Sequence, residues 1–193
     1  MTTRRDFLKT MTMASAGLAL GTGDLLGAPI SVSQRKAAAD KVKIAYVGIG
    51  NRGEQIIGDF ARTGMVEVVA LCDVDMGAPH TQKVMNMYPK AKRFRDFRQM
   101  FDKAGNDFDA VAIATPDHSH FPITMLALAS GKHVYVEKPL ARTFYEAELL
   151  MQAALKRPNL VTQVGNQGHS EANYFQFKAW MDAGIIKDVT AVT

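Results

Sequence analysis

The 193-residue chain has a formal net charge of +4, with 47% hydrophobic and 22% charged residues. This is the composition of a globular protein, and it excludes a disordered chain. The basic excess lies before residue 40, so residues 40–193 carry a net charge of only +1. They also lack the basic patch interleaved with aromatic residues that would indicate nucleic acid as a partner.

The length and the single cysteine limit the architecture further. A chain of 193 residues can bury one well-packed domain and leaves little for a second. Cys72 is the only cysteine, which excludes an intrachain disulfide and a multi-cysteine metal site.

Residues 1–39 have the features of a removable signal peptide. A basic start, a mildly hydrophobic middle and the small-residue site AAAD follow one another, and we expect cleavage after Ala39. The stretch TRRDFLK, with Arg4 and Arg5 paired, resembles a twin-arginine signal. This implies the twin-arginine export machinery as a partner and a periplasmic or otherwise exported location. The alternative is a disordered or amphipathic N-terminus with a chance Arg-Arg pair. No apolar run approaches the roughly 20 residues needed to span a bilayer, so no permanent membrane anchor is expected.

From residue 41 onward, short β-branched runs alternate with amphipathic stretches, which predicts an α/β fold with a doubly wound parallel sheet. Thr143 and Glu146 form a predicted capping box, and Gly131 and Gly184 are expected to end helices. Strands are predicted within residues 43–50, 65–75, 108–116, 133–139 and 159–165. Helices are predicted over residues 54–63, 80–88, 120–130, 143–156 and 170–184, and residues 92–103 hold a short strand and a short helix.

The domain boundaries follow from this pattern. Residues 40–165 are expected to form the sheet domain. Residues 185–193, IIKDVTAVT, begin another β-rich segment, which we interpret as the first strand of a second domain. Residues 166–193 would then be the start of that domain, in a chain that is truncated within it.

The stretch GIGNRG at residues 48–53 matches G-x-G-x-x-G directly after a strand and at the start of a helix. Gly48 permits the tight turn, Gly50 lets the backbone approach a pyrophosphate, and Gly53 lets the helix pack on the strand. The phosphates then lie at the positive end of the helix dipole. We therefore predict a Rossmann-type dinucleotide site that includes the whole stretch: Gly48, Ile49, Gly50, Asn51, Arg52 and Gly53.

Asp73 ends the second strand, about where a carboxylate meets the ribose 2′-hydroxyl of a dinucleotide. A carboxylate there repels a 2′-phosphate, so NAD is predicted as the cofactor and NADP is disfavoured. Asp75 competes with Asp73 for this role, and a solvated loop carboxylate is the alternative for Asp73.

The stretch ATPDHSH at residues 114–120 follows the fourth strand, at the edge of the sheet where ligands of open α/β folds bind. Thr115, Pro116, His118 and His120 are therefore expected beside the cofactor. His118 and His120 have no third ligand in view, so no metal site is predicted. Asp117 or Ser119 is instead expected to cap the following helix.

Glu137, Lys138 and Pro139 follow the fifth strand and are expected at the same edge, where they would contact the cofactor. A lysine there can donate a proton to a developing alkoxide or polarise a carbonyl. The alternative is a surface or ion-paired lysine.

The succession of GIGNRG, Asp73, TPDHSH and VEKPLA resembles the Gfo/Idh/MocA family of nicotinamide-dependent oxidoreductases over residues 41–193. The resemblance implies that Lys138 is the catalytic lysine beside the nicotinamide. It also implies that the loop at Thr115 and Pro116 contacts the cofactor. Typical substrates of the family are sugars, cyclitols and other polyols, which lose or gain a hydride at a secondary carbinol.

The stretch QVGNQGHS resembles an exported branch of that family. The resemblance places Gln163, Asn166, Gln167 and His169 near a carbohydrate substrate. Capping of the next helix is an equally good interpretation of these residues.

The family's catalytic Asp/His pair lies in the second domain, and no D-x-x-x-H follows Lys138 here. The chain is therefore expected to hold NAD and to lack residues needed for turnover, and a homo-oligomer is expected only for a full-length form. Two alternatives stay open: an NAD-dependent glycosidase of the same superfamily, and an inactive NAD-binding fragment. A twin-arginine signal is compatible with NAD, because that pathway carries folded proteins that already hold their cofactor.

Overall fold

The computed structural model describes residues 41–169 and 171–191. The predicted signal peptide at residues 1–39 lies outside the described residues. Among those that are described, no helix is long and apolar enough to cross a membrane.

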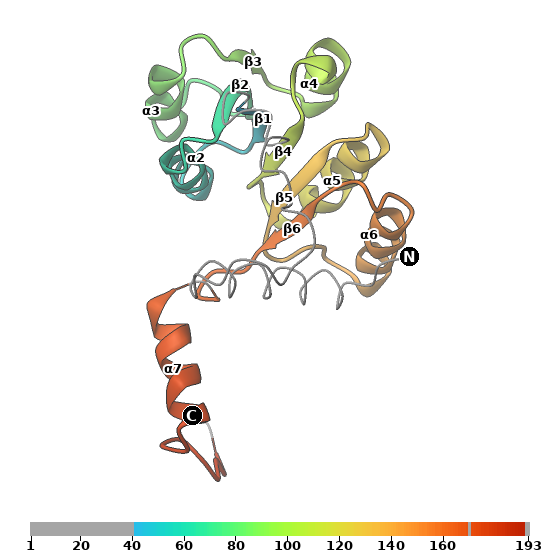
Figure 1. The fold of residues 1–193 in the computed structure, drawn as a ribbon. Helices are drawn as coiled ribbons and strands as arrows, with labels where there is room; N and C mark the ends of the chain where they lie inside the picture. Colours follow the sequence, from blue (N-terminus) through green and yellow to red (C-terminus); the bar gives the residue numbers. More distant parts are fainter. Residues whose placement is uncertain (1–40, 170, 192–193) are drawn as a thin grey trace, which may run out of the picture. The chain divides into compact units, whose positions relative to one another are not determined.

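Six parallel strands form one sheet in the order β3-β2-β1-β4-β5-β6 (Figure 1). This is the strand order of a dinucleotide-binding doubly wound sheet, with its switch point between β1 and β4. The predicted α/β class is therefore confirmed. The strands are β1 (Val42–Val47), β2 (Val66–Cys72), β3 (Lys92–Phe94), β4 (Ala110–Ile113), β5 (His133–Glu137) and β6 (Thr162–Gly165).

The helices begin and end close to the predicted positions. Thr143 and Glu146 form the predicted capping box at the start of α6, and Gly131 and Gly184 adopt positive φ after α5 and α7. The helices are α2 (Arg52–Arg62), α3 (Pro79–Met87), α4 (Phe97–Ala104), α5 (His120–Ala129), α6 (Phe144–Leu155) and α7 (Ala172–Asp182), with short 3₁₀ turns η2 (Gly105–Asp107) and η3 (Asp117–Ser119).

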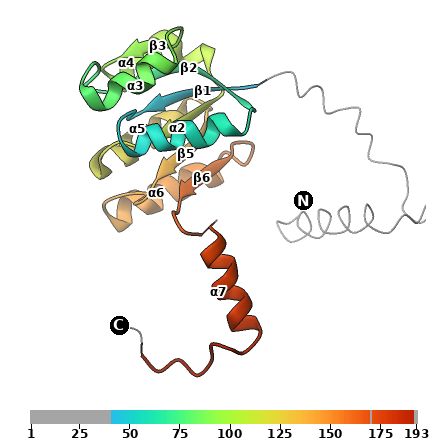
Figure 2. The same cartoon turned by 90° about the vertical axis from the view of Figure 1, so that its left-hand side faces the viewer.

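Both faces of the sheet are buried along its central strands. Along β1, Ala45 and Val47 pack into a core formed with α4, α5 and α6, while Ile44 and Tyr46 pack into a second core with α2 and α3. Figures 1 and 2 show these two groups of helices on opposite sides of the sheet. Burial on both faces explains why the strands read as nearly continuous apolar runs.

Two local predictions are wrong. Neither Asp117 nor Ser119 caps α5 with its side chain, because the 3₁₀ turn satisfies the amides: Ser119 N–H bonds to Pro116 O and His120 N–H to Asp117 O. The described part of the strand predicted at residues 185–193 is not a strand, because residues 185–191 pair with no neighbouring strand and Asp188 has a left-handed φ of 52°.

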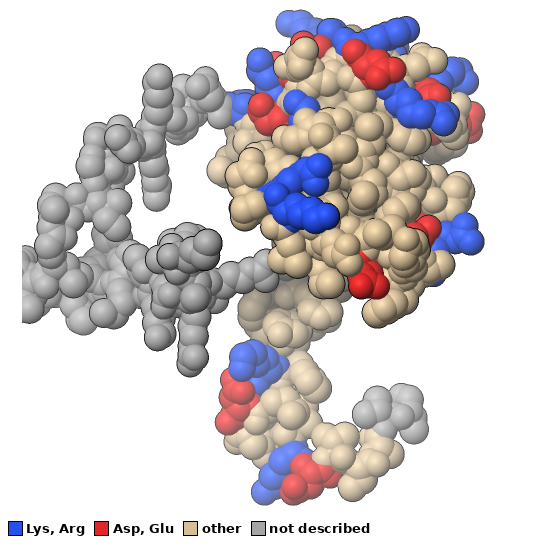
Figure 3. Space-filling model, turned by 90° about the vertical axis from the view of Figure 1, so that its right-hand side faces the viewer, with Lys and Arg blue, Asp and Glu red and all other residues tan. Residues whose placement is uncertain are grey.

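Charged side chains of both signs are interspersed on the face shown in Figure 3. Ion pairs among the described residues include Lys92 with Asp107 and Lys178 with Asp182, both at 2.8 Å. Much of the remaining area on that face is uncharged.

Candidate functional site

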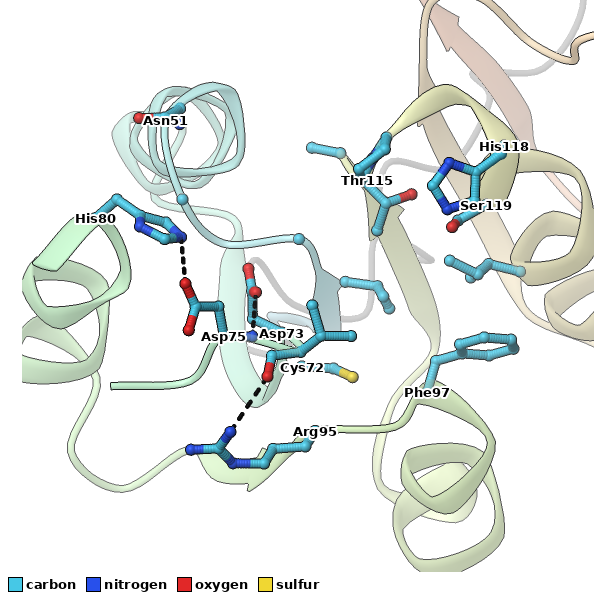
Figure 4. Close-up of a pocket in the computed structure, with 17 residues that line it drawn as sticks. Asn51, Cys72, Asp73, Asp75, His80, Arg95, Phe97, Thr115, His118 and Ser119 are labelled. Carbon is cyan, nitrogen blue, oxygen red and sulfur yellow. Dashed lines mark hydrogen bonds and ion pairs between the residues drawn. The ribbon is translucent and has the colours of Figure 1, made fainter. Parts of the chain in front are cut away.

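A cavity of about 450 Å³ opens at the carboxyl ends of the central strands (Figure 4). This volume suits a cofactor-sized ligand. The cavity is lined by the turn after β1, the end of β2, the start of α3, the segment after β3 and the loop after β4. Seven of the predicted site residues meet there: Gly48, Gly50, Asn51, Asp73, Thr115, Pro116 and His118.

The turn after β1 has no room for side chains at two of its glycines. Gly48 has φ 81°, and a Cβ there would lie 2.5 Å from Ala114 O. A Cβ on Gly53 would overlap the carbonyl oxygen of Gly48. The turn can therefore lie against the end of β4, with α2 starting directly behind it, only because both residues are glycine.

The third glycine of the turn, Gly50, faces the cavity. A Cβ on Gly50 would meet the imidazole of His80, which extends from α3 and also lines the cavity (Figure 4). Beside Gly50, the first turn of α2 offers backbone N–H groups that have no partner within the helix. Bare backbone at a helix N-terminus is a phosphate-binding arrangement.

Asp73 is held in place by two backbone amides. Its Oδ2 accepts a hydrogen bond from Ile49 N–H and its Oδ1 accepts one from Asp75 N–H, both at 2.9 Å. Each oxygen keeps a further acceptor position. Asp75, by contrast, is exposed and has His80 Nε2 at 3.8 Å. The fixed carboxylate of the pair is therefore Asp73.

Arg95 and Phe97 line the cavity from the segment after β3, and sequence reasoning missed both. The Arg95 guanidinium donates hydrogen bonds to Val74 O at 3.2 Å and Met76 O at 2.8 Å, so it holds the loop after β2. The only signal in the sequence was their place after the predicted short strand. His80, also missed, lies in a helix with no recognisable motif.

Cys72 forms part of the cavity wall and is 2% exposed. Burial, with the nearby carboxylates of Asp73 and Asp96, raises the pKa of the Cys72 thiol to about 12. The reactive thiolate is therefore scarce at neutral pH. We expect iodoacetamide at pH 7.5 to label Cys72 only as the chain unfolds in urea, as followed by mass spectrometry. Rapid labelling of the folded chain would contradict the buried position.

Thr115 carries a side-chain oxygen that is buried and has no hydrogen-bond partner among the described residues. The residue lines the cavity together with Pro116 and His118. A buried hydroxyl left unpaired costs free energy unless a ligand completes it. This orphaned group, the bare glycine turn and the fixed carboxylate of Asp73 all fit a bound dinucleotide.

Arg52 and Glu137 pair with each other and do not line the cavity. Arg52 Nε and Nη2 lie 3.1 and 2.9 Å from Glu137 Oε1, and Tyr135 OH donates to the same oxygen at 3.2 Å. Burial alone would lower the pKa of Arg52, but the hydrogen bond and the charge of Glu137 raise it overall. The Arg52 guanidinium is therefore charged near neutral pH.

His120 is also outside the cavity, at 1% exposure. Its Nδ1 lies 2.6 Å from Pro139 O and its Nε2 lies 2.8 Å from Thr115 O. His120 therefore joins the loops after β4 and β5. Within residues 41–169 and 171–191, no cluster of three or more potential metal ligands occurs.

The other predicted residues lie elsewhere. Ile49 and Gly53 are buried behind the turn, and Lys138 and Pro139 are exposed just after β5. Of the four residues predicted near a substrate, Gln163 donates to Val164 O and His169 stacks on Tyr174, while Asn166 and Gln167 are exposed. None of these predicted residues lines the cavity.

Residues 42–165 match the family model GFO_IDH_MocA, an oxidoreductase family with an NAD-binding Rossmann fold. The chain belongs to this family. The resemblance inferred from the glycine turn, Asp73, TPDHSH and VEKPLA is therefore confirmed, and with it NAD as the cofactor of the fold.

The chain is similar in sequence or in structure to several individual proteins. It is 31% identical over 167 residues to a glycosyl hydrolase family 109 protein of Shewanella pealeana, covering 78% of this chain and 36% of the relative. It is 31% identical over 147 residues to inositol 2-dehydrogenase of Salmonella paratyphi B, covering 75% and 43%. The crystal structure of scyllo-inositol dehydrogenase from Lactobacillus casei with bound NAD(H) and scyllo-inositol superposes with a TM-score of 0.67 at 29% identity, covering 78% and 44%. The chain thus spans less than half the length of each of these relatives.

Proposed function

We propose that this chain is the NAD-binding part of an oxidoreductase that transfers hydride between NAD and a secondary alcohol of a sugar or cyclitol. The observation that carries the proposal is the cavity formed by Gly48, Gly50, Asp73 and Thr115 in a chain of an NAD-binding oxidoreductase family. The relatives that act on inositols support a polyol substrate.

Different residues of the cavity bind different parts of NAD. The bare turn at Gly50 and the N-terminus of α2 receive the pyrophosphate, and Asp73 accepts hydrogen bonds from the adenosine ribose. The unpaired hydroxyl of Thr115 forms a hydrogen bond with the nicotinamide half of NAD. Bound NAD supplies a hydride acceptor at its nicotinamide ring.

Asp73 is the basis for preferring NAD over NADP. Replacing it with asparagine removes a charge-assisted acceptor, which is worth about 1.5–3 kcal/mol, so NAD should bind about 10- to 100-fold more weakly. The ratio of NADP to NAD affinity should rise, because the repulsion of a 2′-phosphate is gone. Calorimetric titration with both cofactors measures these changes.

Asp75→Asn is the matched control, because Asp75 is exposed and does not bond to the glycine turn. It should change NAD affinity little. A larger loss in Asp75→Asn than in Asp73→Asn would assign the ribose contact to Asp75.

Lys138 is proposed as the group that moves a proton to or from the substrate oxygen. It follows β5 at the carboxyl edge of the sheet, and its side chain is free to reach a ligand beyond the cavity. Gln163, Asn166 and His169 are proposed as hydroxyl-binding groups on the same side. Lys138→Met should abolish turnover and leave NADH affinity within about twofold, since Lys138 lies outside the cavity wall.

The activity test uses protein purified from the cells that make it. Reduction of NAD⁺ on addition of inositols or simple sugars, followed at 340 nm and lost in Lys138→Met, would support the oxidoreductase. The similarity to a glycosyl hydrolase family 109 protein favours a second candidate, an NAD-dependent glycosidase. Release of the aglycone from an aryl glycoside without net reduction of NAD⁺ would select that candidate and contradict the first.

We further propose export by the twin-arginine pathway, based on Arg4 and Arg5 in TRRDFLK. Replacing both with lysine should retain the chain in the cytoplasm. Cell fractionation with an antibody to the chain tests this, and an unchanged distribution would contradict it. Because NAD is not free in the periplasm, export implies that the protein carries its cofactor with it and recycles it during turnover.

A further inference from the structure

The two residues that flank Lys138 in the chain, Glu137 and Pro139, are both held by hydrogen bonds to other parts of the structure. On one side, Glu137 is 4% exposed and its Oε1 accepts hydrogen bonds from Arg52 and Tyr135. On the other side, Pro139 O lies 2.6 Å from the buried ring of His120. The backbone of Lys138 is therefore fixed from both directions, although its side chain is exposed.

Gly165 in β6 packs directly over the carboxylate of Glu137. A Cβ at Gly165 would lie 2.6 Å from Glu137 Oε1 and would overlap Tyr135 OH, so any larger residue would have to displace these two side-chain ends. Glu137 and Gly165 are also paired residues of the neighbouring parallel strands β5 and β6. The carboxylate is thus enclosed and must be paired to be charged.

Arg52 connects this enclosed carboxylate to the glycine turn. It is the first residue of α2, directly after Asn51, so its backbone belongs to the proposed pyrophosphate site. Its guanidinium is turned out of the cavity and bonds to Glu137, 85 residues along the chain. Strand β4 separates β1 from β5, so the pair spans two strand spacings, about 9–10 Å.

We propose that Arg52 and Glu137 are positioning residues that couple occupation of the phosphate-binding turn to the placement of Lys138. The inference rests on the proposed function for the role of Lys138. A phosphate that orders the turn fixes the backbone of Arg52. Arg52 then holds Glu137, and Glu137 fixes the start of the Lys138 loop. By linkage, the ordered loop favours phosphate binding to the same extent.

ADP is the probe, because it carries the adenosine and pyrophosphate and has no nicotinamide that could touch Lys138 directly. The test measures backbone hydrogen exchange of residues 137–141 in the 193-residue chain, with and without ADP at a saturating concentration measured for each variant. The variant is Arg52→Met combined with Glu137→Gln, which removes both charges together and leaves an amide acceptor for Tyr135. Lys92→Gln is the matched control. It breaks the exposed ion pair of Lys92 with Asp107, and Lys92 lies in β3, at the opposite edge of the sheet from β6.

In the unmodified chain and in Lys92→Gln, ADP should slow exchange of residues 137–141 by about threefold or more. In the double variant ADP should still bind, but exchange of this segment should slow less than about 1.5-fold. Glu137→Gln alone, which keeps all side chains near their original size, provides a second variant if the double one folds poorly, and it should show an intermediate effect.

Equal slowing in the unmodified chain and the double variant would overturn the coupling and reduce the pair to a structural role. A double variant that folds but does not bind ADP would also overturn it, because Arg52 would then be a binding residue. Failure of the unmodified chain to bind ADP would overturn the proposed function as well, so the two failures are distinguishable.

Discussion

Gly53→Ala should destabilise the fold by about 3 kcal/mol, the upper end of what overpacking costs. The new Cβ would overlap the Gly48 carbonyl oxygen, which is backbone and cannot rotate away. Relief requires α2 to move away from β1, which opens the core around Ile56 and Ile57. Urea unfolding of the 193-residue chain, followed by circular dichroism, measures the change in the free energy of unfolding.

Gly58→Ala is the control in the same helix. A Cβ at Gly58 meets nothing within 4 Å, so the alanine should stabilise the chain by about 0.5–1 kcal/mol through helix propensity. Opposite signs for the two substitutions would show that the turn, and not the helix, requires glycine. A neutral Gly53→Ala would contradict the close packing of α2 on the turn.

Arg52→Met should cost about 3–5 kcal/mol of stability, because it leaves Glu137 buried without its counter-charge. The exposed pair of Lys92 and Asp107 should contribute less than about 1 kcal/mol when broken by Lys92→Met. Chemical denaturation of both variants gives the comparison directly.

The double variant Arg52→Met, Glu137→Gln completes a thermodynamic cycle. It should recover most of the stability lost in Arg52→Met, because no uncompensated charge stays buried. If the two single substitutions add without coupling, the ion pair of Arg52 with the buried Glu137 does not exist as described.

The residues within short stretches of sequence were predictable. The glycine turn at residues 48–53, Asp73 at the end of β2 and the capping box of Thr143 with Glu146 each follow from a local spacing that has one physical reason. The structure places Gly48, Gly50 and Asp73 in one cavity, as expected. The α/β class with a parallel sheet also followed, because strands that alternate with helices leave few topologies.

The residues that act through distant partners were not predictable. Arg52 was expected at the cofactor and His120 beside it, but their side chains bond to Glu137 and to the carbonyls of Thr115 and Pro139. Nothing local in the sequence indicates a partner 85 residues away. The strand expected at residues 185–193 also depended on a partner, and its described part, residues 185–191, has none.

Binding of NADH to the 193-residue chain and to its Gly50→Ala variant is the decisive test of whether the glycine turn binds the dinucleotide. A Cβ at Gly50 displaces only the His80 ring, which can rotate, so the fold should survive with a loss below about 1.5 kcal/mol. The same Cβ stands where the backbone would approach the pyrophosphate, and NADH affinity should fall by about tenfold or more. Calorimetric titration should therefore show binding to the unmodified chain and strongly weakened binding to the folded variant. No binding to the unmodified chain, or equal binding to both, would contradict the assignment of the glycine turn as the dinucleotide site.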